Sequence, residues 1–207
     1  MAIATRYTQI LTTAAQIFAR RGFHQASTRE IAGAAGLSLA GLYHYVGGKD
    51  ELLFLVLDRA LDTLLGELDE ALASARTPED KLLALIRTHL EFALHRPAEL
   101  RIINRDGELL ADPKRAEVAA KRQSYVRSGL GILRELDAHG RPGDELLSAT
   151  NLLLGMLNGI GRPPFIRTSD DARALADQVG SLFLYGFLEG SAPEAVPAAA
   201  LGGQHDD

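Results

Sequence analysis

Acidic side chains are nearly absent from the first quarter of the chain, so the basic side chains there could bind a polyanion. Residues 1–49 hold five Lys or Arg and one acid, Glu30, whereas the rest of the 207-residue chain holds 17 basic and 26 acidic side chains. The two parts carry formal charges of +4 and −9, within a net charge of −5. Because Lys and Arg attract phosphate oxygens, a basic module on an acidic body predicts that one end of the protein meets phosphate.

Patterns typical of catalysis or metal binding are missing from the sequence. The chain has no cysteine, which excludes thiol nucleophiles and disulfides and fits a reducing cytoplasm. Glu91 and His95 lie one turn apart, but no second such pair completes a metal site. Neither a phosphate-cradling glycine loop nor a nucleophile elbow occurs. We therefore expect no enzyme activity, no cofactor and no metal.

Helix signals recur along the chain, and no series of strands is indicated. An apolar face with helical spacing predicts a first helix that ends at Gly22. Ser27 and Glu30 have the spacing of a capping box, which would begin a second helix. A third helix is expected from Ser38 through Tyr45, where two glycines follow.

Residues 27–46 meet the requirements of a helix-turn-helix, in which one helix crosses the DNA backbone and the next enters the major groove. Small Ala32, Ala35 and Gly36 allow the two helices to approach closely. The side expected to be buried consists of apolar residues at helical spacing: Ile31, Ala35, Leu37 and Leu42.

The sequence around this motif resembles the signature of TetR-family transcription regulators. The matching runs are Ser27 to Ala32, Ala35 to Ser38, Leu42 to Tyr45 and Lys49 to Leu52. The resemblance implies an all-α fold with an N-terminal three-helix helix-turn-helix DNA-binding module and a C-terminal helical ligand-binding and dimerisation domain. It also implies a cytoplasmic homodimer, a repressor released from palindromic double-stranded operator DNA by a small-molecule effector.

The same resemblance assigns DNA contacts. Thr28 and Arg29 would lie near phosphate and a groove edge, and three further residues would hold phosphates: Tyr43, Tyr45 and Lys49. The residues expected to face base edges are Ser38, Leu39, Ala40, Gly41 and His44. Because Leu39, Ala40 and Gly41 offer little hydrogen bonding, thymine methyl contacts, Arg29 and DNA shape would carry more of the specificity.

Three regions are expected along the chain: a DNA-binding domain at 1–48, a ligand-sensing and dimerisation domain at 49–190, and a disordered tail at 191–207. Three short helices should be followed by about six longer ones. The first of these, from Lys49, would connect the two domains and transmit the effect of the ligand. No apolar run is long enough for a membrane span.

Candidate residues for pairing and for sensing lie in the second domain. The predicted dimer interface is Leu152, Gly155, Met156, Gly159, Val179, Leu182, Phe183, Gly186 and Phe187, with burial inside one chain as the alternative. The predicted ligand contacts are His89, Phe92, Arg101, Ile102, Arg105, Tyr125, Met156, Asn158 and Phe165.

The class of the effector is also suggested by resemblance. The body is loosely similar to family members that respond to fatty acyl or steroid-derived CoA thioesters, which predicts an apolar or amphipathic effector. Arg101 and Arg105 would then meet its anionic end. The alternatives are a helical interaction protein that does not bind DNA and, less expected, an enzyme.

Overall fold

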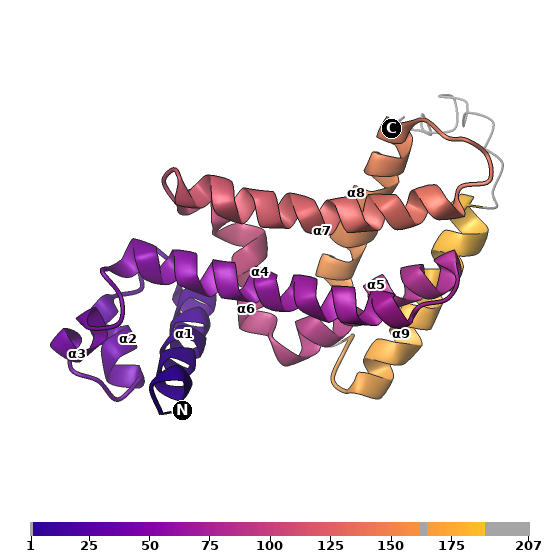
Figure 1. Cartoon of the computed structure of the whole chain (residues 1–207). Coiled ribbons are helices and arrows are strands. Elements are labelled where there is room, and N and C mark those ends of the chain that lie inside the picture. Colours follow the sequence, from indigo (N-terminus) through magenta and orange to yellow (C-terminus); the bar gives the residue numbers. More distant parts are fainter. Residues whose placement is uncertain (1, 162–164, 189–207) are drawn as a thin grey trace, which may run out of the picture.

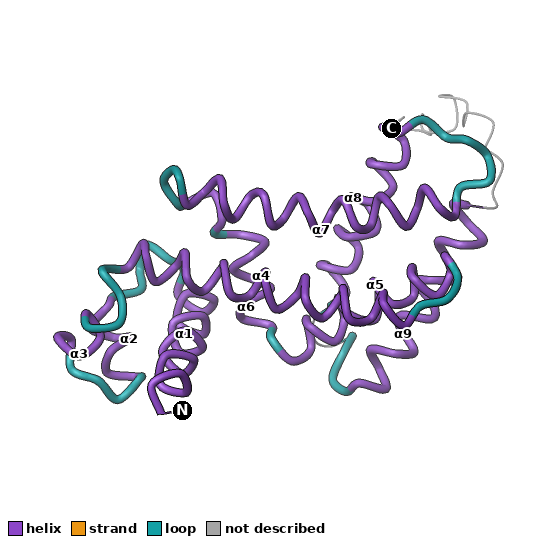
Figure 2. Tube along the Cα trace, viewed as in Figure 1, coloured by secondary structure: helices purple, strands orange, loops and turns teal. Residues whose placement is uncertain are grey.

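The computed structural model describes residues 2–161 and 165–188, so the tail expected to be disordered lies outside the described residues. Those ranges contain helices and no strand, which confirms the all-α prediction (Figures 1 and 2). None of these helices has the length and apolar character needed to cross a bilayer. The helices are α1 (Ala2–Arg21), α2 (Thr28–Ala34), α3 (Leu39–Tyr43), α4 (Lys49–Ser74), α5 (Pro78–His95), α6 (Pro97–Arg105), η1 (Gly107–Leu109), α7 (Lys114–Leu136), α8 (Gly143–Ile160), α9 (Ser169–Ser181) and η2 (Leu182–Leu188).

Helices α1 to α3 form a small module at one end of the molecule (Figure 1). Here α1 spans 20 residues, so the expectation of three short helices is wrong for the first. The Ser27 side chain accepts from the backbone N–H of Glu30, as a cap should. The other half of the predicted capping box is not formed, because the Glu30 carboxylate pairs with Arg21 at 2.8 Å.

The predicted connector is a single helix of 26 residues, α4, which begins at Lys49 beside the module and runs into the body (Figure 1). It contacts α1, α5, α6 and α7. Its buried side consists of small and apolar residues at helical spacing: Leu52, Leu53, Val56, Leu57, Ala60, Leu61, Leu64 and Leu68.

Local capping signals determine where several helices of the body begin. Thr77 opens α5 with a complete capping box, and Thr168 opens α9 in the same way. Helix α7 ends at Leu136, where the Asp137 carboxylate accepts from the backbone N–H groups of His139 and Arg141. Helix α9 continues directly as the π-helix η2.

Gly161 fixes α8 against α5, the two helices that carry Asn158 and His89. A Cβ at this position would lie 2.8 Å from the Leu157 carbonyl oxygen and 2.9 Å from the Cβ of Ala93. Neither atom is the end of a flexible side chain, so Gly161→Ala should lower the free energy of unfolding by about 1–3 kcal/mol in a urea titration.

Gly66→Ala on α4 is the matched control. A Cβ there meets no atom within 4 Å, so this substitution should raise the free energy of unfolding by about 0.5–1 kcal/mol through helix propensity. Equal effects of the two substitutions would contradict the close packing at Gly161.

Candidate functional site

The two helices α2 and α3 are joined by a tight turn, as a helix-turn-helix requires. Gly36 has φ +66°, a left-handed conformation that favours glycine. The backbone N–H of Leu37 then donates to the Ala32 carbonyl. Ile31 and Leu42 are fully buried beneath the turn. The apolar side chains therefore hold α3 across α2 with its outer side open to solvent.

The residues predicted to contact DNA lie mainly on the open side of this module. Arg29, Ala40, Tyr43 and His44 are exposed. The Thr28 hydroxyl lies 3.4 Å from the Tyr43 hydroxyl, so the structure brings together two predicted phosphate contacts from different helices. Ser38 caps α3 and is exposed. Three other predicted contacts are half-buried: Leu39, Gly41 and Tyr45, the last packed against the core. The exposed surface of α3 is therefore small and weakly polar.

Lys49 has a structural role that the sequence did not suggest. Its ammonium donates to the carbonyl oxygens of Phe23, His24 and Ala26 at 3.0, 3.3 and 3.2 Å, and lies 4.5 Å from the centre of the Phe23 ring. An ammonium has three N–H donors, and these carbonyls accept all three. Lys49 stays a predicted phosphate contact, but its position ties the loop after α1 to the start of α4.

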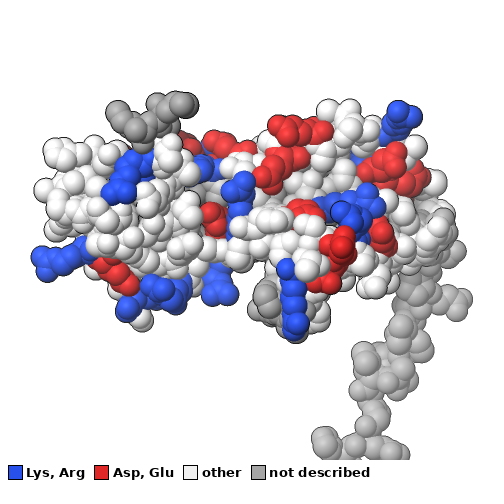
Figure 3. Space-filling model, turned by 90° about the horizontal axis from the view of Figure 1, so that it is seen from below, with Lys and Arg blue, Asp and Glu red and all other residues white. Residues whose placement is uncertain are grey.

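Charge separates along the molecule as it does along the sequence. In Figure 3, Lys and Arg side chains gather at the end formed by the small module, whereas the body carries acidic and basic side chains side by side. Arg6 and Arg20 belong to the module, and Arg20 lies 3.7 Å from Glu30. The basic end can attract a polyanion that the acidic body would repel.

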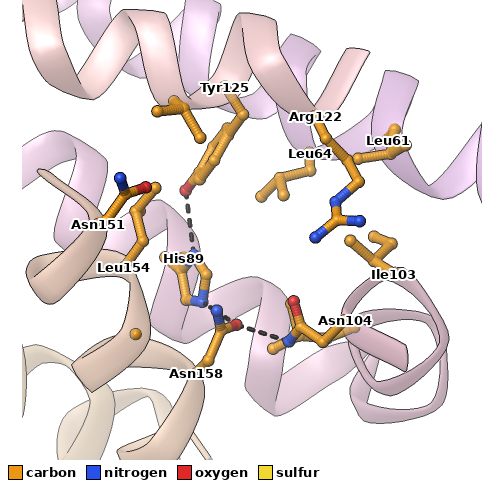
Figure 4. Close-up of a pocket in the computed structure, with 13 residues that line it drawn as sticks. Leu61, Leu64, His89, Ile103, Asn104, Arg122, Tyr125, Asn151, Leu154 and Asn158 are labelled. Atoms are coloured by element: carbon orange, nitrogen blue, oxygen red, sulfur yellow. Dashed lines mark hydrogen bonds between the residues drawn. The ribbon is translucent and has the colours of Figure 1, made fainter. Parts of the chain in front are cut away.

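A second candidate site is a cavity of about 230 Å³ inside the body. It lies among α4, α5, α6, α7 and α8 (Figure 4). The residues that line it are Leu61, Leu64, His89, Leu100, Ile103, Asn104, Arg122, Tyr125, Val126, Asn151, Leu154, Gly155 and Asn158. The described residues contain no cluster of His, Asp or Glu that could hold a metal ion.

Four polar side chains form a hydrogen-bonded chain across the cavity (Figure 4). The Asn104 amide donates to Asn158 Oδ1 at 2.7 Å, and His89 Nε2 lies 3.2 Å from the same oxygen. His89 Nδ1 lies 3.2 Å from the Tyr125 hydroxyl. Burial lowers the pKa of His89 to about 4, against a smaller opposing effect of Asn158, and burial raises the pKa of Tyr125. Both rings are therefore neutral near pH 7.

Three of the predicted ligand contacts line this cavity: His89, Tyr125 and Asn158. The structure places the others elsewhere. Phe92 and Ile102 are buried in the core, Met156 is half-buried outside the lining, and Phe165 is exposed. Helical periodicity alone does not say which of several buried faces borders a cavity.

The prediction that Arg101 and Arg105 meet the anionic end of a ligand in this cavity is not supported by their positions. Their guanidinium groups donate to the carbonyl oxygens of Ala19 and Phe18 at the end of α1. Arg105 also pairs with the buried Asp106 at 2.6 Å. The charged residue that lines the cavity is Arg122, which we did not predict, although it precedes Tyr125 by one turn on α7.

Part of the predicted dimer interface is available on the surface. The exposed fraction is 71% for Leu152 and 60% for Leu182, and Gly155, Gly159 and Gly186 are also exposed. Val179 and Phe183 are buried inside the chain, so for these two residues the alternative of intramolecular core holds. The side chain of Phe187 lies outside the described residues. Tyr185, which was not predicted, is 68% exposed.

Two family models match the chain. The model described as bacterial regulatory proteins, tetR family, matches residues 10–56, which contain the helix-turn-helix. The model described as tetracyclin repressor-like, C-terminal domain, matches residues 75–162, which contain most residues of the cavity.

Individual proteins are also similar to this chain. The HTH-type transcriptional repressor KstR2 of Mycolicibacterium smegmatis is 32% identical over 138 residues, which are 66% of this chain and 67% of that protein. A TetR-family transcriptional regulator from Bordetella parapertussis has a TM-score of 0.80 at 26% identity, over 90% of this chain and 97% of that one. AibR, solved in complex with isovaleryl coenzyme A and operator DNA, has a TM-score of 0.74 at 28% identity, over 86% of this chain and 98% of that one.

The buried neutral His89 makes stability depend on pH. Its folded-state pKa of about 4 lies below the ordinary 6.5, so its contribution is fully present above pH 6.5 and is lost as pH falls toward 4. Relative to His89→Gln, the wild-type protein should lose up to about 3 kcal/mol of unfolding free energy between pH 6.5 and 4. Urea titrations of both proteins across that range measure the loss. Parallel pH profiles would show that His89 is not buried as a neutral ring.

Proposed function

Because the chain belongs to the TetR family of bacterial regulatory proteins, we propose that it is a repressor that binds palindromic operator DNA and is released by a small amphipathic effector. One observation carries the proposal: α4 connects a helix-turn-helix with an open outer side to a cavity with polar and apolar walls. The relative KstR2 is named a repressor, and AibR was solved with both a CoA thioester and operator DNA.

We propose residues 1–48 as the DNA-binding domain and 49–190 as the sensing and dimerisation domain. The boundary coincides with the first residue of α4. We also propose that the protein lacks catalytic activity: the family is regulatory, and the described residues offer no metal cluster. A helical interaction protein that does not bind DNA is the alternative, and DNA selection distinguishes the two.

In this proposal Arg29 contributes to specificity, whereas Thr28 and Tyr43 position the module on phosphates. Arg29 is exposed at the start of α2 and has no hydrogen-bond or ion-pair partner among the described residues. Its guanidinium is therefore available to a guanine edge, which it can contact with two hydrogen bonds. The paired hydroxyls of Thr28 and Tyr43 suit a phosphate oxygen.

Two copies of the chain are needed because one short recognition helix reads few base pairs. We propose that the exposed apolar side chains Leu152, Leu182 and Tyr185 contribute to the contact between the copies. A two-fold dimer would place two copies of α3 in successive major grooves, about 34 Å apart.

Two helices can transmit a structural change from the cavity to the DNA-binding module when the effector binds. Leu61 of α4 borders the cavity, and the same helix begins at Lys49, which holds the loop after α1. Helix α6 is the second route: its Ile103 borders the cavity, whereas Arg101 and Arg105 on another face donate to α1. A hundredfold release of DNA requires about 2.7 kcal/mol of differential affinity between the two conformations.

DNA selected from random sequences should contain an inverted repeat, and Arg29→Ala tests how it is read. This variant should lose about 1–3 kcal/mol of affinity for the selected site and less for random DNA, if Arg29 contacts a guanine. Gel shifts across a salt titration measure both affinities.

Lys49→Ala is the comparison within the same module. If Lys49 contacts phosphate, it should weaken binding to both DNAs and lower the salt slope by about one contact per subunit. Because the Lys49 ammonium also donates to three backbone carbonyls, the free energy of unfolding of the Lys49→Ala variant must be measured together with its DNA affinity. Selection that enriches no inverted repeat would favour the interaction protein instead.

The route through α6 is tested by combining Arg101→Ala with Arg105→Lys, which keeps a cation beside Asp106. Affinity for the operator and for isovaleryl coenzyme A or octanoyl coenzyme A should each stay within about twofold, whereas the factor by which the thioester weakens DNA binding should fall about 3- to 10-fold. Arg127→Ala, at an exposed position of α7, is the control. An unchanged coupling factor would leave α4 as the sole route.

A further inference from the structure

We infer that the cavity selects a ligand with two different polar ends joined by an apolar chain. An anionic group lies at Arg122, and a neutral oxygen, as a hydroxyl or keto group, lies against Asn151 and Asn158. This inference rests on the proposed function of ligand sensing and specifies the chemistry of what is sensed. In Figure 4, Arg122 points into the cavity beside Ile103, whereas Asn151 lies on the side of Tyr125 and His89.

Hydrogen-bond geometry fixes the direction of the polar chain. Asn158 Oδ1 can only accept, and it accepts from Asn104 at 2.7 Å. His89 Nε2, 3.2 Å from this oxygen, must therefore carry the proton. In a neutral imidazole the other nitrogen is then an acceptor, so the Tyr125 hydroxyl donates to His89 Nδ1 at 3.2 Å. The protons of His89 and Tyr125 are thus already committed.

What remains for a ligand comes from neutral amide groups: two lie on one face of α8, and the Asn104 amide oxygen lies on α6. Asn151 lines the cavity and makes no hydrogen bond with any described residue. The Asn158 side-chain oxygen accepts within the series of hydrogen bonds, so its NH₂ group remains available to a ligand. The seven-residue spacing places both amides on the same side of the helix, and Gly155 between them presents no side chain. Such a surface can both donate to and accept from a hydroxyl, and can donate to a ketone.

An anion does not suit this end of the cavity. His89 stays neutral near pH 7 because burial lowers its pKa to about 4, and no cation stands beside it in the lining. Among the described residues, Arg122 is the only charged one that lines the cavity. Its described ion pair is with the exposed Glu108 at 3.8 Å, a separation that leaves the guanidinium available to a ligand. The anionic end of the ligand therefore belongs at Arg122.

The region between the two ends is apolar and limited in size. Leu61, Leu64 and Leu154 form its walls. A cavity of about 150 Å³ accommodates benzene, so the 230 Å³ here suits a group of about eight to ten non-hydrogen atoms. An eight-carbon chain with an oxygen at the far end has this size.

Calorimetric titration of the full-length protein, without DNA, tests the inference with octanoate, 8-hydroxyoctanoate and 1,8-octanediol. Because the hydroxyl adds hydrogen bonds to the half-buried Asn158 and the exposed Asn151, wild-type protein should bind 8-hydroxyoctanoate about 3- to 10-fold more tightly than octanoate. The diol should bind more weakly than the hydroxy acid, since it lacks the charge that Arg122 recognises.

Variants separate the two ends. In Asn151→Leu and in Asn158→Leu, the preference for the hydroxy acid should fall toward one. Asn151 has no hydrogen-bond partner among the described residues, so its variant does not disturb the His89 network. Arg122→Gln should weaken both acids by the same factor, about 3- to 10-fold, and leave the diol unaffected. Arg127→Gln, on the same helix and outside the lining, should change nothing.

The corresponding coenzyme A thioesters identify the source of the anion. If the free acids bind more tightly, Arg122 meets their carboxylate; if the thioesters bind more tightly with the same hydroxyl preference, Arg122 meets the thioester end and the phosphates lie outside the cavity. The inference is overturned by equal binding of octanoate and 8-hydroxyoctanoate, by a preference that survives both asparagine substitutions, or by no binding of any probe.

Operator release is a separate measurement that distinguishes the two proposals. A ligand that binds with the expected preference but leaves DNA affinity unchanged counts against the proposed function alone. A thioester that releases DNA without any hydroxyl preference counts against this inference alone.

Discussion

The buried side of α4 holds the two parts of the molecule on one stiff element. Its 26 residues make a rod about 39 Å long. Near its start, Leu52 and Leu53 are fully buried, and further along Leu61 and Leu64 border the cavity. A helix resists stretching, and packed interiors change between discrete arrangements rather than deforming smoothly. A change at the cavity wall therefore reaches the module as a movement of the rod.

The contact between α6 and α1 adds a second connection with different chemistry. Asp106 is buried, and its carboxylate is balanced by Arg105, which also donates to the Phe18 carbonyl. Removal of Arg105 would leave this buried carboxylate without its ion-pair partner. The pair therefore tends to move as one unit with the end of α1, while the neighbouring Asn104 belongs to the cavity. One short helix thus presents different side chains to the two regions that a regulator must couple.

The polar chain inside the cavity limits what the body can recognise. Each buried polar atom needs a partner, and Tyr125, His89, Asn158 and Asn104 supply one another with partners in a fixed order. The buried polar side chains of the described residues accordingly leave no atom without a hydrogen bond. The arrangement holds His89 neutral and leaves charge recognition to Arg122 at another part of the lining.

The sequence by itself determined features that depend on neighbouring residues. Ser27 caps the helix that it was expected to cap, Thr77 and Thr168 open their helices in the same way, and Gly36 allows the turn between α2 and α3, because capping and turn geometry act within a few residues. The segregation of charge follows from composition alone, and the all-α fold follows from recurring helical periodicity and capping signals. The resemblance of the motif then pointed to the family.

Only the tertiary structure decided which side chains meet across long distances in the chain. His89 and Asn158 are 69 residues apart, and Arg105 contacts a carbonyl 87 residues away. Helical spacing shows that Arg101 and Arg105 share a face but not which neighbour that face meets, since this depends on how each helix is rotated in the bundle. Glu30 was expected to complete a capping box, but in the packed structure it pairs with Arg21. Lys49 was expected to contact phosphate, and in the packed structure its ammonium donates to three backbone carbonyls.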